Sequence, residues 1–339
     1  MSKILGINHF KNRLNDFKKI KEVTEEYPFR ITEYYTDLIQ SYDKKDPIFS
    51  QCFPQKKELQ DSSKFSLDPF CEKQNQKIES FIHRYPNKGV LLLNNICGVN
   101  CRHCMRKRLW DNNKKEISKD RIDDIISYCI KEEINDVIIS GGDPLMSSPE
   151  LLDEVVSRLS EVRNIKVIRI GSRIPVVDPD RINEKIISIF KKTEKLHLLT
   201  HFNHPKEVTD LSKCYISKIV DTGTPVFNQT VLLKNINDSA STLSELFMKL
   251  LEIKIKPYYL HQCDLVRGVT HFWVEPSRGI KLLKKMEGLI SGLAMPYYAI
   301  DLPGGKGKVL LGPNSELSKI NGKYILKNYK NETISYSLY

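Results

Sequence analysis

No stretch of the sequence approaches the roughly 18 consecutive apolar residues that a membrane-spanning helix requires. The first residues, Met1 to Lys11, contain no apolar core followed by a small-residue cleavage site, which a secretory signal peptide needs. The sequence also contains no low-complexity tract and no regular cysteine framework of the kind that disulfides stabilise in secreted proteins. We therefore expect a cytoplasmic protein with no membrane partner.

Charge is present in excess but is not concentrated. The 53 basic residues outnumber the 42 acidic ones, which gives a formal net charge of +11. The lysines are spread in pairs along the chain, and the interleaved aromatic residues of a base-stacking surface are not evident. We therefore favour a solvated basic surface over a nucleic-acid-binding one, with RNA or an acidic protein partner as the alternative.

Three regions differ in sequence pattern. Residues 1–85 are polar and interrupted by proline, and they predict an N-terminal helical cap with short helices over Asn15–Glu26 and Arg30–Tyr42. In residues 86–295, short apolar runs alternate with amphipathic segments, as in successive βα units around a parallel sheet. Residues 296–339 are predicted to form a short C-terminal extension that contains a lysine loop and a weak strand pair.

The barrel region predicts an α/β fold. The expected strands are Val90–Asn94, Asp136–Ser140, Lys166–Ile170, Lys195–Thr200, Pro225–Val231, Pro257–His261 and Met295–Ile300. The expected helices are Ser118–Glu132, Ser148–Ser160, Asp180–Phe190, Glu207–Thr222, Ser241–Ile253 and Glu275–Leu289. Six βα units are too few for a closed eight-unit barrel, so we expect an open, partial (β/α)6 barrel.

A cluster of cysteines follows the first predicted strand. Cys97, Cys101 and Cys104 form a C-x3-C-x2-C array. Thiolates are soft ligands that suit zinc or an iron–sulfur cluster, and both usually take four ligands. A zinc site would need His103 or the distant Cys129, whereas a four-iron cluster on three thiolates leaves one iron open to a small molecule. The spacing resembles the signature of radical S-adenosylmethionine (SAM) enzymes, and we favour the cluster.

Polar or glycine-rich residues follow every predicted strand, where barrels of this kind collect their chemistry. Gly141 and Gly142 would allow a ligand to approach the backbone closely, although such glycines are often only a turn. Arg173 could hold a carboxylate in its planar fork or be a surface arginine. His201 could contact a ligand or satisfy buried backbone groups.

A glycine loop, Pro303-Gly-Gly-Lys-Gly-Lys308, follows the last predicted strand. Its glycine spacing does not match a P-loop, and no Ser or Thr follows the lysine. A lysine beside glycines that admit a planar ring suits binding of pyridoxal phosphate, and a solvated loop lysine is the alternative.

Together these motifs resemble the lysine 2,3-aminomutase family, in order from about His83 to the end of the chain. The motifs that carry the resemblance are Cys97–Arg108, Ser140-Gly-Gly-Asp, Ile170-Gly-Ser-Arg-Ile-Pro, Thr200-His-Phe-Asn-His-Pro, Asn228-Gln-Thr-Val-Leu-Leu, Cys263-Asp-Leu and Asp301-Leu-Pro-Gly-Gly-Lys-Gly-Lys308. The resemblance implies a radical SAM barrel whose three cysteines hold a [4Fe-4S] cluster with SAM on the open iron.

The resemblance also implies roles for individual residues. Lys308 matches the lysine that binds pyridoxal phosphate, while Arg84 and Lys88 match the residues around its phosphate. The implied SAM-binding residues are His103, Ser140, Gly141, Gly142, Asp143, Arg173 and His201. The implied substrate-binding residues are Arg106 and Gln229 at the carboxylate, and Asp264 and Asp301 at the distal ammonium.

The implied activity is that of an isomerase that moves the 2-amino group of L-lysine to C3. The resemblance further implies a reducing partner such as flavodoxin or ferredoxin, and it allows a homodimer. A sister aminomutase for arginine or glutamate, a β-lysine supplier for elongation factor P and a non-catalytic iron–sulfur sensor are the alternatives. The chain departs from the family at Lys88, usually arginine, and at Lys306, usually glycine, so that two lysines compete for the cofactor.

Overall fold

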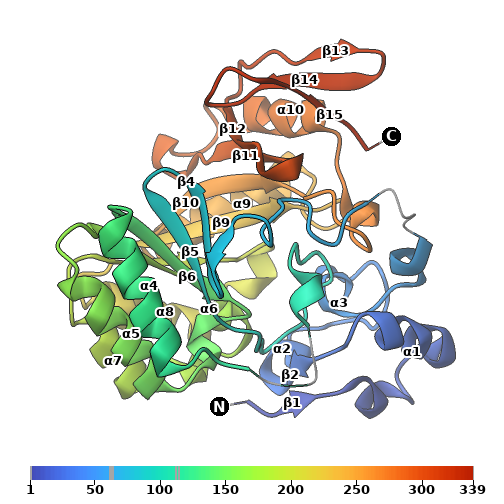
Figure 1. The fold of residues 1–339 in the computed structure, drawn as a ribbon. Coiled ribbons are helices and arrows are strands. Elements are labelled where there is room, and N and C mark those ends of the chain that lie inside the picture. The colour runs from blue at the N-terminus through green and yellow to red at the C-terminus, as the bar shows by residue number, and fades with distance from the viewer. Residues whose placement is uncertain (1, 61–64, 111–112, 114, 339) are drawn as a thin grey trace.

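The computed structural model describes residues 2–60, 65–110, 113 and 115–338. Its centre is a 10-stranded sheet with the order β12-β11-β10-β9-β8-β7-β6-β5-β4-β3 (Figure 1). Strands β5 to β11 are parallel neighbours in chain order, while β3, β4 and β12 join antiparallel at the two edges. The strand order runs from β12 at one end to β3 at the other without closing on itself, so the sheet forms an open barrel, as predicted.

The sheet and its helices have the following bounds. The strands are β3 (Gln76–Ile78), β4 (Phe81–Tyr85), β5 (Lys88–Asn94), β6 (Asp136–Gly141), β7 (Val167–Gly171), β8 (Leu196–Thr200), β9 (Val226–Leu232), β10 (Ile255–Gln262), β11 (Tyr297–Leu302) and β12 (Gly307–Leu311). The connecting helices are α4 (Lys119–Lys131), α5 (Pro149–Glu161), α6 (Ile174–Val177), α7 (Glu184–Phe190), α8 (Asp210–Val220), α9 (Ala240–Glu252) and α10 (Pro276–Met286).

The local sequence explains these elements. In α4, Ile122, Ile125 and Cys129 are buried at helical spacing, and the Ser118 side chain accepts the Arg121 N–H at the N-cap. In β6, alternate residues Val137 and Ile139 are buried. All seven predicted strands are observed within two residues of their expected bounds.

Residues 1–85 differ from the expectation of helices alone. The helix α1 (Phe17–Glu26) is confirmed, and α3 (Pro47–Cys52) follows later. The predicted helix Arg30–Tyr42 is wrong over most of its length, because β2 (Ile31–Thr32) pairs with β1 (Ile4–Leu5) and only α2 (Glu33–Asp37) is helical. Strands β3 and β4 extend the central sheet. The proposed division of the chain at residues 85 and 295 stays a prediction.

The C-terminal residues form a separate sheet of three antiparallel strands. Its strands are β13 (Ser318–Ile320), β14 (Lys323–Lys327) and β15 (Thr333–Tyr336), of which β13 and β14 are drawn above α10 and β15 beside it in Figure 1. The central sheet curls so that its two ends approach each other, since Arg84 on β4 lies 3.8 Å from Asp301 on β11. The curl brings the glycine loop between β11 and β12 close to β4.

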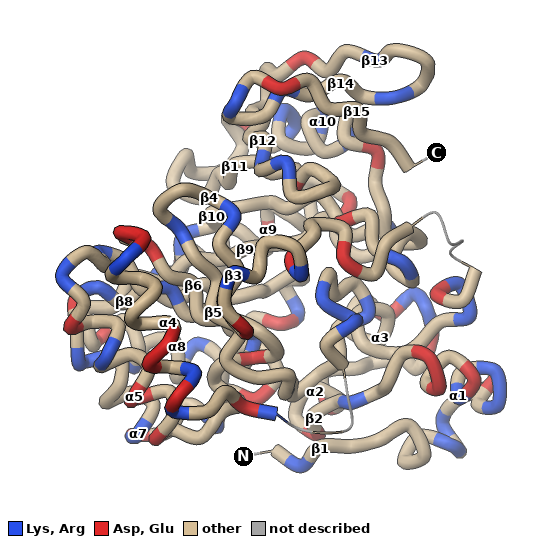
Figure 2. Tube along the Cα trace, viewed as in Figure 1, with Lys and Arg blue, Asp and Glu red and all other residues tan. Residues whose placement is uncertain are grey.

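Charged residues of both signs are interspersed along the chain rather than gathered on one element (Figure 2). Among the described residues, no helix combines the length and apolar character that crossing a membrane requires.

Candidate active site

The three cysteines of the predicted cluster lie together in the loop after β5. All are free thiols, and the Cys104 N–H donates to the Cys101 carbonyl at 2.9 Å, which closes the turn between them. Burial, followed by the nearby sulfur of Cys104, raises the pKa of Cys97. The Arg173 guanidinium donates to Cys101 Sγ at 2.7 Å.

Within the described ranges, no three His, Cys, Asp or Glu side chains converge on one metal position. A cluster requires a different arrangement, since each thiolate of a four-iron cluster binds its own iron. The residues fit such a group, because three thiols share one loop and a cation lies against one of them.

A fully buried ion triad anchors the cysteine loop to the N-terminal region. Glu58 accepts from Arg102 Nη2 at 2.6 Å and from Lys107 Nζ at 2.7 Å, and all three side chains are 0% exposed. Arg102 and Lys107 flank Cys104, so Glu58 holds the loop from both sides. Glu58 could not be predicted from the sequence, because it lies in a polar segment with no regular pattern.

The glycine pair at the end of β6, Gly141 and Gly142, packs against the start of the cysteine loop. A Cβ on Gly141, whose φ is +117°, would lie 2.3 Å from the Asn94 carbonyl oxygen. A Cβ on Gly142 would lie 2.4 Å from the Ile96 carbonyl oxygen. The glycines therefore admit neighbouring backbone, where the sequence suggested a ligand. The Asp143 carboxylate accepts from the Ser172 hydroxyl and the Arg173 N–H, both at 2.7 Å.

Arg173 is buried in a polar network, so the alternative of a surface arginine is wrong, and its role toward the carboxylate of SAM stays a prediction. Its Nη2 donates to Glu207 Oε1 at 2.7 Å, to Gln51 at 2.7 Å and to the Tyr35 hydroxyl at 3.0 Å. Arg173 and Glu207 form an ion pair in which the Glu207 side chain is fully buried, so the positive charge of one compensates the negative charge of the other. Arg173 thereby joins α2 and α3 to the cysteine loop, since its Nη1 donates to Cys101 Sγ, while its Nε donates to the His201 carbonyl at 3.2 Å.

Two histidines lie beside this network. His103 is half-buried, with its Nε2 3.3 Å from Asn203 Nδ2, and its buried Nδ1 has no hydrogen-bond partner among the described residues. His201 Nδ1 lies 3.1 Å from the Gln229 carbonyl oxygen, and burial lowers the pKa of His201 to about 4. Loss of solvation also lowers the pKa of His103, so both rings are neutral near pH 7. The open Nδ1 of His103 next to the cysteines fits a polar ligand such as SAM.

The glycine loop is the turn of a hairpin that pairs Lys308 directly with Asp301. The two residues are cross-strand partners on β12 and β11, and Lys308 Nζ donates to Asp301 Oδ2 at 2.5 Å. His261 Nδ1 lies 3.3 Å from Lys308 Nζ, and the ring of Tyr259 lies 5.0 Å from it. Lys306 instead faces Glu332 at 3.9 Å and is 52% exposed. The geometry supports Lys308 as the cofactor lysine.

The two aspartates differ in their electrostatic surroundings. Burial would raise the pKa of Asp301, but the Lys308 ammonium outweighs it and lowers the pKa below its ordinary value. Burial, followed by the charge of Asp301, raises the pKa of Asp264 to about 8. Arg106 lies within electrostatic range of Asp264, and its Nη1 donates to the Ser140 hydroxyl at 3.0 Å. These groups therefore share one region at the C-terminal ends of β5, β6, β10 and β11.

Some predicted residues are not brought into this cluster of contacts. Lys88 is exposed and begins β5, the end of the strand opposite to the cysteine loop. Gln229 lies in β9 and contacts His201 through its backbone carbonyl. Their roles toward cofactor phosphate and substrate stay predictions.

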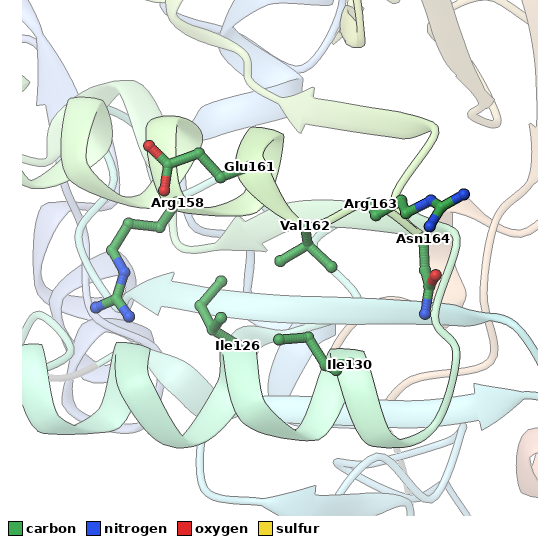
Figure 3. A pocket seen from close by; sticks show the side chains of 7 residues that line it. All are labelled: Ile126, Ile130, Arg158, Glu161, Val162, Arg163 and Asn164. Carbon is green, nitrogen blue, oxygen red and sulfur yellow. The ribbon is translucent and has the colours of Figure 1, made fainter.

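A surface hollow of about 340 Å³ lies elsewhere, between α4 and α5 (Figure 3). Ile126, Ile130, Val162 and the Arg158 side chain line it. These residues lie near the C-terminal ends of both helices, which lead into the starts of β6 and β7. The cysteine loop follows the opposite, C-terminal end of β5, so the hollow is not part of the site.

Comparison with known proteins agrees with this geometry. A family model for a 4Fe-4S single cluster domain matches residues 84–172, and a model for lysine-2,3-aminomutase matches residues 283–338. A putative L-lysine 2,3-aminomutase of Aquifex aeolicus is 40% identical over 94% of this chain and 87% of its own length. L-lysine 2,3-aminomutase of Methanococcus maripaludis is 38% identical over 99% of this chain and 77% of its own length. Glutamate 2,3-aminomutase of Clostridioides difficile is 34% identical over 93% of this chain and 75% of its own length.

An open parallel barrel with this cysteine loop after its first parallel strand defines a radical SAM enzyme with a [4Fe-4S] cluster. More narrowly, the chain belongs to the lysine 2,3-aminomutase family, whose members are isomerases.

Proposed function

We propose that this chain moves the 2-amino group of L-lysine to C3 to give β-lysine, using a [4Fe-4S] cluster, SAM and pyridoxal phosphate. Family membership leaves the amino acid open, because a glutamate 2,3-aminomutase is among the similar proteins. The observation that carries the choice of lysine is the pair of carboxylates, Asp264 and Asp301, on the side of the site that holds Lys308.

The cofactors supply the radical that removes hydrogen from the substrate and the conjugated ring that delocalises the unpaired electron. Cys97, Cys101 and Cys104 would hold the cluster, and His103 offers an open nitrogen beside it. Lys308 would hold pyridoxal phosphate, with Arg84 near enough to Asp301 to face the same region. The protein positions these groups, and its buried walls exclude water.

Charge complementarity favours lysine over glutamate. Lys308 would hold the cofactor aldehyde through its Nζ, so its ammonium would no longer be free to pair with Asp301, and Arg84 at 3.8 Å would be the cation left beside this carboxylate. Two neighbouring carboxylates repel each other unless cations balance them. The distal ammonium of lysine would supply further positive charge, whereas the distal carboxylate of glutamate would add to the repulsion. Arg106 is the nearby cation for the α-carboxylate.

We also propose a small acidic electron carrier, such as flavodoxin or ferredoxin, as the reducing partner. The net charge of +11 supports attraction to an acidic protein.

The test is competition between lysine, arginine and glutamate at equal concentration, on protein reconstituted without oxygen, with product identification by mass spectrometry. We expect β-lysine as the main product. Preferred turnover of glutamate would contradict the charge argument, and preferred turnover of arginine would reassign the enzyme to a sister activity.

A further inference from the structure

A segment before β3 crosses the region of the proposed active site. We call residues 65–75 the strap. Its Pro69 carbonyl accepts the Gly304 N–H at 2.7 Å, and its Ser66 carbonyl accepts the Arg267 N–H at 3.2 Å. The Arg84 guanidinium lies 5.9 Å from the Phe70 ring. The strap therefore contacts the lysine hairpin, the loop after β10 and β4.

The glycine loop is shaped to receive the strap. A Cβ on Gly305, whose φ is +70°, would lie 2.7 Å from the Phe70 carbonyl oxygen. The sequence suggested that these glycines admit a planar ring, whereas the structure places strap backbone against Gly305. The lysine hairpin and the strap thus form one packed unit.

Glu72 of the strap binds the guanidinium assigned to the substrate carboxylate. Its Oε1 accepts from Arg106 Nη2 at 2.7 Å, and its Oε2 accepts from Arg106 Nε at 3.1 Å. Glu72 is 7% exposed, and although burial opposes it, Arg106 lowers the pKa of Glu72 to about 2. The Asp68 carboxylate accepts the Glu72 N–H at 3.0 Å, which fixes the turn that presents this carboxylate.

The contacts of Arg106 leave part of its guanidinium open. An arginine side chain has five N–H donors, two on each terminal nitrogen and one on Nε. Glu72 takes Nε and one donor of Nη2, and Ser140 takes one donor of Nη1. Among the described residues, one N–H on each terminal nitrogen has no hydrogen-bond partner, and such a pair matches the two oxygens of a carboxylate.

The charges around Glu72 also preserve an anion-binding site. Arg108 Nη2 donates to Glu72 as well, so the carboxylate is shared between two guanidiniums. These three groups together carry one net positive charge. Asp68 lies 3.7 Å from Arg108, and its side chain is 17% exposed, so solvent partly screens its charge. A substrate carboxylate at Arg106 would meet a net cation.

We propose that Glu72 is a positioning residue that fixes Arg106 so that its open pair of N–H groups receives the α-carboxylate of the amino acid substrate. This inference rests on the proposed function only in so far as the substrate is an α-amino acid. A Glu72 that competed with the substrate for the same donors would have the opposite effect on affinity.

The experiment compares L-lysine with L-lysinamide, whose α-carboxylate is replaced by a neutral amide. Each is titrated into protein loaded with pyridoxal phosphate, without SAM, and the dissociation constant is read from the visible absorbance of the cofactor. For Glu72→Gln we expect lysine to bind at least about tenfold more weakly, while lysinamide changes little. Glu72→Asp should recover part of the preference for lysine, since it restores the charge.

The matched control is Glu79→Gln, which removes a surface carboxylate paired with Arg121 and 73% exposed. Glu72→Gln leaves Arg106 and Arg108 without this counter-charge, so a lower unfolding temperature is expected. A general folding defect would weaken both ligands equally, and the ratio of lysine to lysinamide affinity is therefore the measure of positioning. An unchanged ratio of lysine to lysinamide affinity in Glu72→Gln, or tighter lysine binding, would overturn the inference. If the wild type prefers glutamate, the proposed function fails, and glutamate with its α-amide then tests Glu72 independently.

Discussion

Asp264 and Asp301 show how the same side chain acquires different properties in one site. Asp301 is ionised because Lys308 lies against it, whereas Asp264 has no ion pair among those that the described residues form. Sequence spacing predicted that both follow strands near the cofactor lysine. It could not predict which of them is paired, because that depends on distances set by the curl of the sheet.

Lysine use should depend on pH through Asp264. Its pKa of about 8 means that the carboxyl is protonated below that pH, and a substrate ammonium binds the ionised form. We therefore expect kcat/KM for lysine to rise between about pH 6 and 8, by at most tenfold per pH unit. The amino groups of free lysine also titrate, so the quantity to compare is the difference between wild type and Asp264→Asn. Parallel profiles for the two would contradict this role.

The cofactor should be attached to Lys308. Borohydride reduction of the holoenzyme, followed by peptide mapping, should place pyridoxal phosphate on the peptide at Lys308, because this amine lies beside Asp301, His261 and Tyr259. Lys308→Ala should abolish the label. The neighbouring Lys306→Ala is the control and should keep it, and a label on Lys306 would show that the assignment is wrong.

Among the secondary structure elements, those with a clear period were predictable and the others were not. The strands from β5 to β11 and the helices between them follow from buried runs and amphipathic segments. Strands β3 and β4 are short and partly exposed, so no alternation marks them. The failed helix at Arg30–Tyr42 contains residues buried for reasons of tertiary packing, such as Ile31 and Tyr35.

The loop after β5 should bind iron through its cysteines alone. Cys97→Ala, Cys101→Ala and Cys104→Ala should each abolish the cluster absorbance and most of the about four irons per chain expected after anaerobic reconstitution. The control variants are Cys214→Ala, an exposed thiol on α8, and Cys129→Ala, a buried one on α4. Iron content that survives in a loop variant, or stoichiometric zinc that iron does not replace, would contradict the cluster.

The contact between the β5 and β6 loops should tolerate no side chain at residue 142. In Gly142→Ala the new Cβ meets the backbone of Ile96, which cannot move without displacing Cys97. We expect a loss of about 1–3 kcal/mol in the free energy of unfolding and a lower iron content. Gly292→Ala is the control, since a Cβ there meets open space. Equal unfolding curves for the two variants would refute the packing account.

In the molecule as a whole, the N-terminal region completes a site whose named motifs all lie in the barrel. Glu58 anchors the cysteine loop, Glu72 binds Arg106, and Tyr35 and Gln51 bind Arg173. The motifs of the site were predictable because each combines characteristic residue types at fixed spacing. The partners were not, because an acidic residue that pairs across more than thirty positions leaves no local pattern.

Removal of Glu58 should destabilise the protein severely. Glu58→Gln would leave Arg102 and Lys107 as buried cations without a counter-charge, at a cost of about 3–5 kcal/mol in the free energy of unfolding. Chemical denaturation measures the effect. Glu150→Gln, which breaks an exposed pair with Lys185, should leave stability nearly unchanged. Similar losses of unfolding free energy in both variants would contradict the claim that the buried triad stabilises the protein more than an exposed ion pair does.

In the hairpin between β11 and β12, the number of residues in the turn determines the distance between Asp301 and Lys308. Asp301 and Lys308 face each other because a fixed number of residues separates them across the turn. Side chains alternate between the faces of a strand, so one residue added to the turn would send Lys308 to the opposite face of β12. The length of the turn therefore sets whether the two charges meet. A variant with one more glycine in the turn would keep every functional group but would separate Lys308 from Asp301.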